Sequence, residues 1–250
     1  MDEMTSTNQK TWNNVAPDFL EASALPVWGP FGVGEDLNLI DEIEGKTFLE
    51  VGCGSGRSIK YLVDQGAKKV FGIDFSETQI AEATRHNLAS IGKGKVKIIQ
   101  MPMEQDFDIE EVDTAFSIYA LGWTLDPETT LANIFLHLKT GGHFIWRWDH
   151  SFFSDVIYKD GEYILAHSYH DESLLTIKNW KRQGNDINIV YRKASTWHQL
   201  LRQAGFEIVG FYEPKPKNLI RGYNDPAKYY SIQKAEKVPA TMIFDCIKRW

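Results

Sequence analysis

Short hydrophobic runs alternate with amphipathic stretches between residues 46 and 148 of this 250-residue chain. Five short runs, each of six or seven residues and partly or mainly apolar, predict five strands: KTFLEV, KKVFGID, KVKIIQ, VDTAFSI and HFIWRW. Between the last two, Leu131, Ile134, Phe135 and Leu138 follow the i, i+3, i+4, i+7 spacing of a helix. Alternating strands and helices of this kind predict parallel pairing in an open α/β sheet.

The segments on either side of this core predict three additions. Residues 1–45 are expected to form an N-terminal helical cap, in which Leu37, Ile40 and Ile43 have helical spacing and Gly45 ends the helix. Residues 151–194 contain the strand-like runs GEYILAH, LLTIKNW and INIVYR, with a turn around residues 183–186, and predict a β-rich insertion. Residues 195–250 are expected to complete the core sheet of residues 46–150, after a short helix capped by Ser195.

Composition and charge narrow the class of protein. A chain with 43% hydrophobic and 24% charged residues is long enough to bury a globular core. The net charge of -7 argues against a nucleic-acid partner, because such proteins usually carry a basic excess. The two cysteines match neither a disulfide framework nor a metal motif, so we expect no metal. A polar N-terminus without a signal, and no apolar run near the roughly 18 residues of a membrane span, favour a cytoplasmic location.

The stretch from Glu50 to Gly56, EVGCGSG, is the most informative part of the sequence. A glycine loop between a strand and a helix allows a ligand to approach the backbone closely. Dinucleotide-binding enzymes use a similar loop, but their third glycine would fall at position 57, where this chain has Arg57. A carboxylate at Glu50 would repel a pyrophosphate and would suit a positively charged ligand, such as one with an ammonium or sulfonium group.

Asp74 ends the second predicted strand, 18 residues after Gly56 (74 − 56). A carboxylate at this place can accept hydrogen bonds from both hydroxyls of a ribose. In open α/β sheets, ligands lie beyond the carboxyl ends of the strands, where both Glu50 and Asp74 are expected. Taken alone, Asp74 could equally cap the next helix, which Ser76 and Gln79 mark with a capping box.

The order of four segments, FLEVGCGSG, FGIDFS, DTAFSIYAL and LKTGGHFIW, resembles the class I S-adenosylmethionine (SAM)-dependent methyltransferases, and within them the UbiE-like small-molecule branch. The likeness covers roughly residues 46–148. It implies a Rossmann-like sheet flanked by helices, and SAM as the cofactor, with S-adenosylhomocysteine (SAH) as product.

The resemblance also implies roles for individual residues. The methionine part of SAM would contact the acid and the glycine loop, the ribose would contact Asp74, and Phe75 would pack on the adenine. Met103 would approach the adenine through its backbone, although the acidic residue usual nearby is replaced by Pro102. The predicted cofactor site thus consists of Glu50, Gly52, Cys53, Gly54, Gly56, Asp74, Phe75, Met103, Ser117 and Ile118.

The segment after the fourth strand bears on the methyl acceptor. It reads SIYALGW, so the DPPY-type motif of enzymes that methylate amides and amines is missing. It contains no cysteine for covalent attack on a pyrimidine. We therefore expect a small-molecule acceptor, aromatic or apolar, with methylation of protein or RNA and a non-catalytic SAM-binding module as the alternatives.

A general base is predicted from position alone. His150 follows the fifth strand and titrates near neutral pH, with Tyr119 and Asp149 as weaker candidates. A loop histidine bonded to the backbone is the alternative for His150. Aromatic residues of the N-terminal segment, Trp12, Phe19 and Trp28, resemble a cap that would close over SAM together with the insertion.

Overall fold

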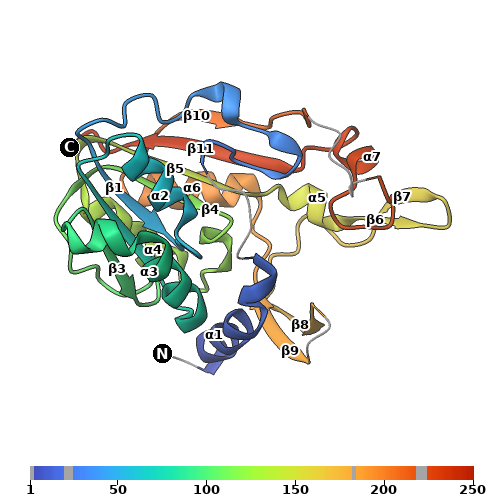
Figure 1. The fold of residues 1–250 in the computed structure, drawn as a ribbon. Helices are drawn as coiled ribbons and strands as arrows, with labels where there is room; N and C mark the ends of the chain where they lie inside the picture. Colours follow the sequence, from blue (N-terminus) through green and yellow to red (C-terminus); the bar gives the residue numbers. More distant parts are fainter. Residues whose placement is uncertain (1–2, 20–24, 182–183, 218–223) are drawn as a thin grey trace.

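A seven-stranded sheet with the strand order β10-β11-β5-β4-β1-β2-β3 forms the centre of the molecule (Figure 1). The computed structural model describes residues 3–19, 25–181, 184–217 and 224–250. The sheet strands are β1 (Thr47–Val51), β2 (Lys69–Asp74), β3 (Val96–Gln100), β4 (Val112–Ile118), β5 (Leu138–Asp149), β10 (Glu207–Tyr212) and β11 (Thr241–Ile247). The first five are parallel, whereas β11 runs antiparallel to both β5 and β10.

The chain order reverses at β1, which pairs with β2 on one side and β4 on the other. Where the strand order reverses, the connections that follow the two adjacent strands leave in opposite directions. This opens a crevice beyond the carboxyl ends of the strands. The glycine loop begins at the end of β1, and Asp74 ends β2. Topology therefore brings the two predicted anchors to one crevice.

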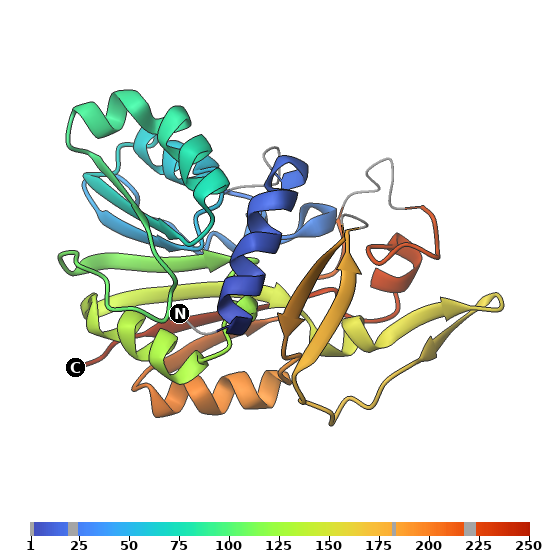
Figure 2. The ribbon, with the colours of Figure 1, turned by 90° about the horizontal axis from the view of Figure 1, so that it is seen from below.

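Helices cover both faces of the sheet (Figures 1 and 2). The helices are α1 (Glu3–Val15), α2 (Arg57–Asp64), α3 (Glu77–Gly92), α4 (Pro127–Leu136), α5 (Ser151–Asp155), α6 (Ala194–Gln203) and α7 (Ile232–Ala235). On one face, Ile59 and Leu62 of α2 join a buried cluster with Phe48 and Phe116 of the strands. On the other face, the apolar sides of α4 and α6 pack against a second cluster that contains Trp146. Two separate cores thus hold the sheet on both sides, and the predicted Rossmann-like fold is confirmed.

Two hairpins lie outside the central sheet. They consist of β6 (Val156–Lys159) with β7 (Glu162–Leu165), and β8 (Leu175–Trp180) with β9 (Asn185–Ile189). Helix α1 lies against the β8–β9 hairpin in both ribbon views. The side chain of Asn8 fixes this contact, because it donates to the Asn188 carbonyl at 2.8 Å and accepts from the Asn188 N–H at 2.7 Å.

Two local predictions are wrong. Residues 38–46 form no helix after the short turn Glu35–Leu37, although Ile40 and Ile43 do pack against the core. A loop that follows the protein surface can bury the same apolar positions without helical hydrogen bonds. Helix α6 begins at Ala194, so Ser195 is not its cap; instead, Glu172 accepts from the Lys193 N–H and the Thr196 hydroxyl.

Within the part of the chain that the structure describes, no helix is long and apolar enough to cross a membrane.

Candidate active site

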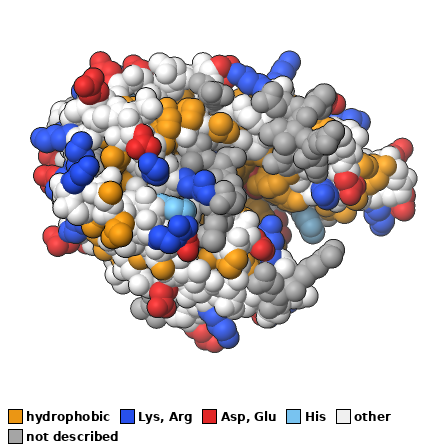
Figure 3. Space-filling model, viewed as in Figure 1, with side chains coloured by type: hydrophobic (Ala, Val, Ile, Leu, Met, Phe, Trp, Pro, Cys, Tyr) orange, Lys and Arg blue, Asp and Glu red, His pale blue; other side chains and the backbone are white. Residues whose placement is uncertain are grey.

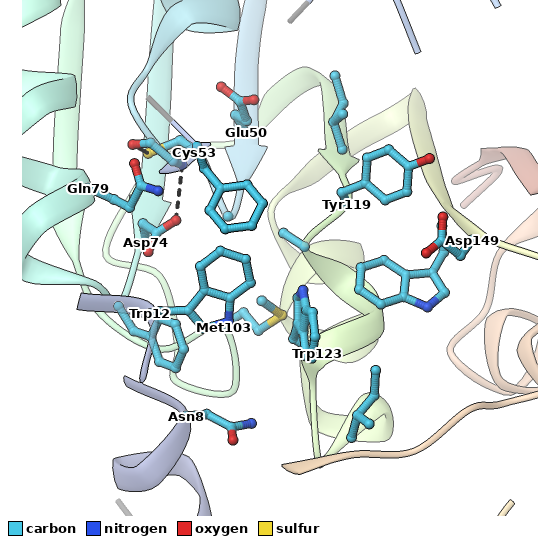
Figure 4. Close-up of a pocket in the computed structure, with 18 of the residues that line it drawn as sticks. Asn8, Trp12, Glu50, Cys53, Asp74, Gln79, Met103, Tyr119, Trp123 and Asp149 are labelled. Carbon is cyan, nitrogen blue, oxygen red and sulfur yellow. Dashed lines mark hydrogen bonds between the residues drawn. The ribbon is translucent and has the colours of Figure 1, made fainter. Parts of the chain in front are cut away.

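A pocket of about 790 Å³ opens at the carboxyl ends of the strands (Figure 4). Its first part is lined by the glycine loop, the end of β2 and Met103, and its second part by side chains from β4, β5 and the C-terminal region. The predicted residues Glu50, Gly52, Cys53, Gly54, Asp74, Phe75, Met103, Ile118 and Tyr119 all line it. Gly56, Ser117 and His150 are not among the lining residues.

The glycine loop has the backbone shape that its sequence predicts. Gly52 has a φ of 75°, and a Cβ there would lie 2.0 Å from the Cβ of Ala120. Gly56 has a φ of 71°, and its missing Cβ leaves room for Ala83 and Asn87 of α3. Gly56 thus permits helix packing behind the loop, whereas Gly52 lets the loop pass closely under the β4 segment.

Glu50 is a buried carboxylate that makes fewer hydrogen bonds than its two oxygens can accept. Its side chain is 4% exposed, and its Oε2 atom has no hydrogen-bond partner among the described residues. Burial raises the pKa of this carboxyl well above its usual range, opposed by a hydrogen bond from Ser58. A buried acceptor of this kind costs free energy unless a ligand supplies a donor. An ammonium group, which donates three hydrogen bonds and carries positive charge, fits this position.

Asp74 joins the glycine loop to the start of α3. Its Oδ2 accepts from the Gly54 N–H at 3.0 Å, and its Oδ1 accepts from the Ser76 N–H at 2.8 Å (Figure 4). Burial raises its pKa to about 6 in spite of these bonds. Each oxygen still has a lone pair that can accept from a ribose hydroxyl. The cap of α3 is Ser76, which accepts from the Gln79 N–H, so Asp74 is not the cap and its contact with the ribose stays a prediction.

Ser117 acts behind the pocket wall. Its hydroxyl donates to the Val51 carbonyl and accepts from the Leu121 N–H, and its side chain is fully buried. It thereby ties the end of β1 to the loop after β4. Glu104, which follows Met103, lines the pocket and accepts a hydrogen bond from Thr124.

The N-terminal helix closes the pocket from one side. Trp12 contacts Trp123 and Trp180 edge-on, with ring centroids 5.5 Å and 5.4 Å away, and it also contacts Phe19. Gln9 donates to the carbonyl of Phe75 at 2.7 Å. These contacts link α1 to both the β8–β9 hairpin and the cofactor end of the pocket. Trp28, predicted to belong to the same cap, is instead a core residue that is 2% exposed and packs on Phe116.

Tyrosines surround the far end of the pocket. Tyr229 and Tyr230 both donate to the carboxylate of Asp149, at distances between 2.9 and 3.0 Å. Burial raises the pKa of Asp149. The ring of Tyr119 lies over the guanidinium of Arg147, 3.1 Å from its centroid to the Cζ atom. The sequence analysis did not identify Arg147, Tyr229 or Tyr230; the only signal was that Arg147 and Asp149 alternate with tryptophans at the end of β5.

His150 does not take the place that the sequence predicts for it. It is 7% exposed, its Nδ1 accepts from the Phe152 N–H as the cap of α5, and its Nε2 lies 2.9 Å from Glu213. Both ring nitrogens are thus engaged outside the pocket, which argues against a role as base. Asp149 is the last residue of β5 and lines the pocket, whereas His150 follows the strand and turns toward α5, which it caps.

The comparisons with known proteins agree with this geometry. A sequence model of the methyltransferase domain matches residues 49–146, which include the glycine loop and most of β5. Residues 49–146 are a methyltransferase domain. A Listeria monocytogenes structure described as a SAM-dependent methyltransferase is 25% identical, with a TM-score of 0.68, and the match covers 83% of this chain and 93% of that one.

Two Haemophilus influenzae proteins are related in sequence. An uncharacterized protein is 26% identical, over 80% of this chain and 86% of its own length. A tRNA U34 carboxymethyltransferase is also 26% identical, over 76% of this chain but only 62% of its own length. The predicted enzyme class, a SAM-dependent methyltransferase, and the predicted cofactor are thus confirmed. The UbiE-like branch stays a prediction.

Proposed function

We propose that this methyltransferase transfers the methyl group of SAM to a small acceptor with an aromatic or apolar body, and that Asp149 accepts the acceptor's proton. The observation that carries the proposal is the second part of the pocket, which is continuous with the cofactor end. It is walled by rings, among them Trp148, Tyr191 and Tyr229. Small-molecule sites commonly combine such apolar walls with a few fixed polar groups.

The cofactor end would hold SAM as the resemblance implies. Glu50 would bind the ammonium group, Asp74 the ribose hydroxyls, and Phe75 and Met103 the adenine. SAM supplies a methyl group on a positively charged sulfur, which is already activated for displacement. The chain's own task is to align the acceptor, exclude water and remove a proton.

Asp149 suits the removal of a proton. When bound, SAM would supply the methyl group to the acceptor's nucleophilic atom and would be left as SAH, whose sulfur carries no charge. The proton of the nucleophile passes to Asp149, which is partly buried at the pocket wall. A raised pKa makes this carboxylate a stronger base than an exposed aspartate. The hydroxyls of Tyr229 and Tyr230 hold it in place.

A tRNA acceptor is the second candidate, because one relative is named as a tRNA-modifying enzyme. The charge of the chain favours the small molecule instead. The net charge is -7, and acidic and basic side chains are interspersed on the face in Figure 3.

The test is transfer of a labelled methyl group from SAM into a cell extract separated into small-molecule, protein and RNA fractions. We expect label in the small-molecule fraction, where mass spectrometry can identify the acceptor. Label in RNA would support the second candidate and contradict the first. Binding of SAM without label in any fraction would also contradict the proposal.

A further inference from the structure

Arg147 is a buried cation at the acceptor end of the pocket. It lies on β5, between Ile118 of β4 and Ile243 of β11, and is 1% exposed. Its Nε and Nη1 atoms have no hydrogen-bond partner among the described residues, although the side chain lines the pocket. A buried charge with unused donors is costly unless a ligand pairs with it.

The protein itself gives this charge no close ion pair in the described parts of the chain. Asp149 attracts the guanidinium electrostatically but does not form a salt bridge with it. Asp149, two residues further along the strand, accepts instead from Tyr229 and Tyr230. Tyr119 is held at a φ of 54°, unusual for a residue with a side chain, with its ring over the guanidinium plane. This ring covers the plane and leaves the edge of the guanidinium as the place for an anion.

The missing anion is better supplied by the acceptor than by SAM. Glu50 of β1 pairs with Phe116 of β4, which pairs with Ile145 of β5, two residues before Arg147. Two strand spacings and two residue rises separate the Cα atoms of Glu50 and Arg147 by about 12 Å. The carboxylate of SAM is attached to the same carbon as its ammonium group, which belongs beside Glu50. Arg57, at the start of α2, lies closer to that end.

We propose that the acceptor carries a carboxylate and that the guanidinium of Arg147 binds it. A hydrogen bond between a guanidinium and a carboxylate is stronger than one between neutral groups. The enzyme therefore methylates a small organic acid, with the acid group on Arg147 and the nucleophile beside Asp149. This inference rests on the proposed function, since it specifies the class of its acceptor.

The first experiment examines the labelled small-molecule product by anion exchange. We expect retention at pH 7 and release at pH 2.5, because a carboxylate loses its charge there whereas a phosphate ester keeps one. A product that passes the exchanger at pH 7, or stays bound at pH 2.5, would overturn the carboxylate while leaving a small acceptor intact. Label only in RNA or protein would instead contradict the proposed function itself.

The second experiment compares variants in the same extract, with benzoate and benzamide as competitors. Arg147→Gln should incorporate label about 10- to 100-fold more slowly, the loss expected for a charged pair, and should bind SAH as the wild type does. Arg147→Lys should recover part of the rate, and Arg85→Gln, on the exposed side of α3, should lose none. Unchanged incorporation by Arg147→Gln, or weaker SAH binding, would overturn the inference.

Inhibition by benzoate and benzamide tests the proposal even if Arg147→Gln does not fold. Benzoate should inhibit the wild-type enzyme at least tenfold more strongly than benzamide, which has the same size but no charge, as expected for a lost charged pair. In Arg147→Lys this preference should decrease. Equal inhibition of the wild type by the two compounds would overturn the proposal.

Discussion

The two ends of the pocket are built in different ways. Most of the cofactor end comes from one continuous segment, in which β1, the glycine loop, α2 and β2 place Glu50 and Asp74 within 25 residues of each other. The acceptor end is assembled from β4, β5, the β8–β9 hairpin and residues near Tyr229. A site built from one short segment suits a ligand that does not change, such as the cofactor. A site built from distant segments can change in shape without altering the cofactor end. The difference indicates that binding of the cofactor and binding of the acceptor depend on separate parts of this chain.

The largest effect should follow from removing the proposed base at the acceptor end. Asp149→Asn keeps the shape of the side chain and should lower the turnover rate by about 10²–10⁴-fold, as expected for loss of general base catalysis. Binding of SAH should be unchanged, because the cofactor end is intact. The rate of label transfer measures turnover, and calorimetric titration measures the binding of SAH. Asp245→Asn, on β11 beside His143, is the control. A variant with normal turnover would show that the acceptor needs no base at Asp149.

The opposite pattern should follow from a change at the cofactor end. Asp74→Ala removes the carboxylate proposed to bind the ribose and also two bonds to the loop backbone. The Kd for SAM should increase by about 10- to 100-fold, equivalent to about 1.5–3 kcal/mol. Calorimetry measures this, with Asp64→Ala, exposed on α2, as the control. Affinity equal to the wild type would exclude Asp74 as a cofactor ligand.

A smaller effect is expected where α1 joins the two ends. Asn8→Ala removes both hydrogen bonds to Asn188 and leaves a buried N–H without a partner. The helix should then open more often, and SAH should dissociate about tenfold faster, in line with the loss of one to two buried hydrogen bonds. Stopped-flow fluorescence can follow release. Thr7→Ala loses only a bond within the exposed helix and should behave as the wild type. Equal release rates for both variants would argue that α1 does not close the site.

The same contrast explains how far the sequence alone could predict the site. Gly52 and Asp74 were recognisable because their roles depend on local backbone shape and on strand ends. Tyr229 and Arg147 lie more than 80 residues apart in sequence and meet only because β11 and its preceding loop return to β5. His150 has suitable chemistry, but it follows β5 as the cap of α5, and its ring nitrogens contact Phe152 and Glu213 outside the pocket. The fold could be predicted from periodicity, whereas the acceptor end depends on long-range pairing that no local pattern reveals.

The smallest expected effect is the pH dependence of SAM binding, which should come from the cofactor end of the pocket. Asp74 has a pKa of about 6 in the free protein, so its ionised fraction decreases as the pH falls through that value. If the ionised form binds the ribose, the Kd for SAM should rise about fourfold between pH 7 and pH 5.5. The stability of the folded protein should change with pH in the opposite direction from the affinity for SAM. The native state holds this proton more tightly than the unfolded chain, so this group makes the unliganded protein more stable as the pH falls from 6 toward 4.

Asp74→Asn separates this effect from other titrating groups, because the amide does not ionise. Its Kd for SAM should be higher than that of the wild type at pH 7 and should lack the part of the increase below pH 6 that Asp74 contributes. Any dependence that persists in Asp74→Asn belongs to Glu50, whose pKa burial also raises. A pH profile of Asp74→Asn identical in shape to that of the wild type would assign the whole effect to Glu50 and the ammonium group beside it.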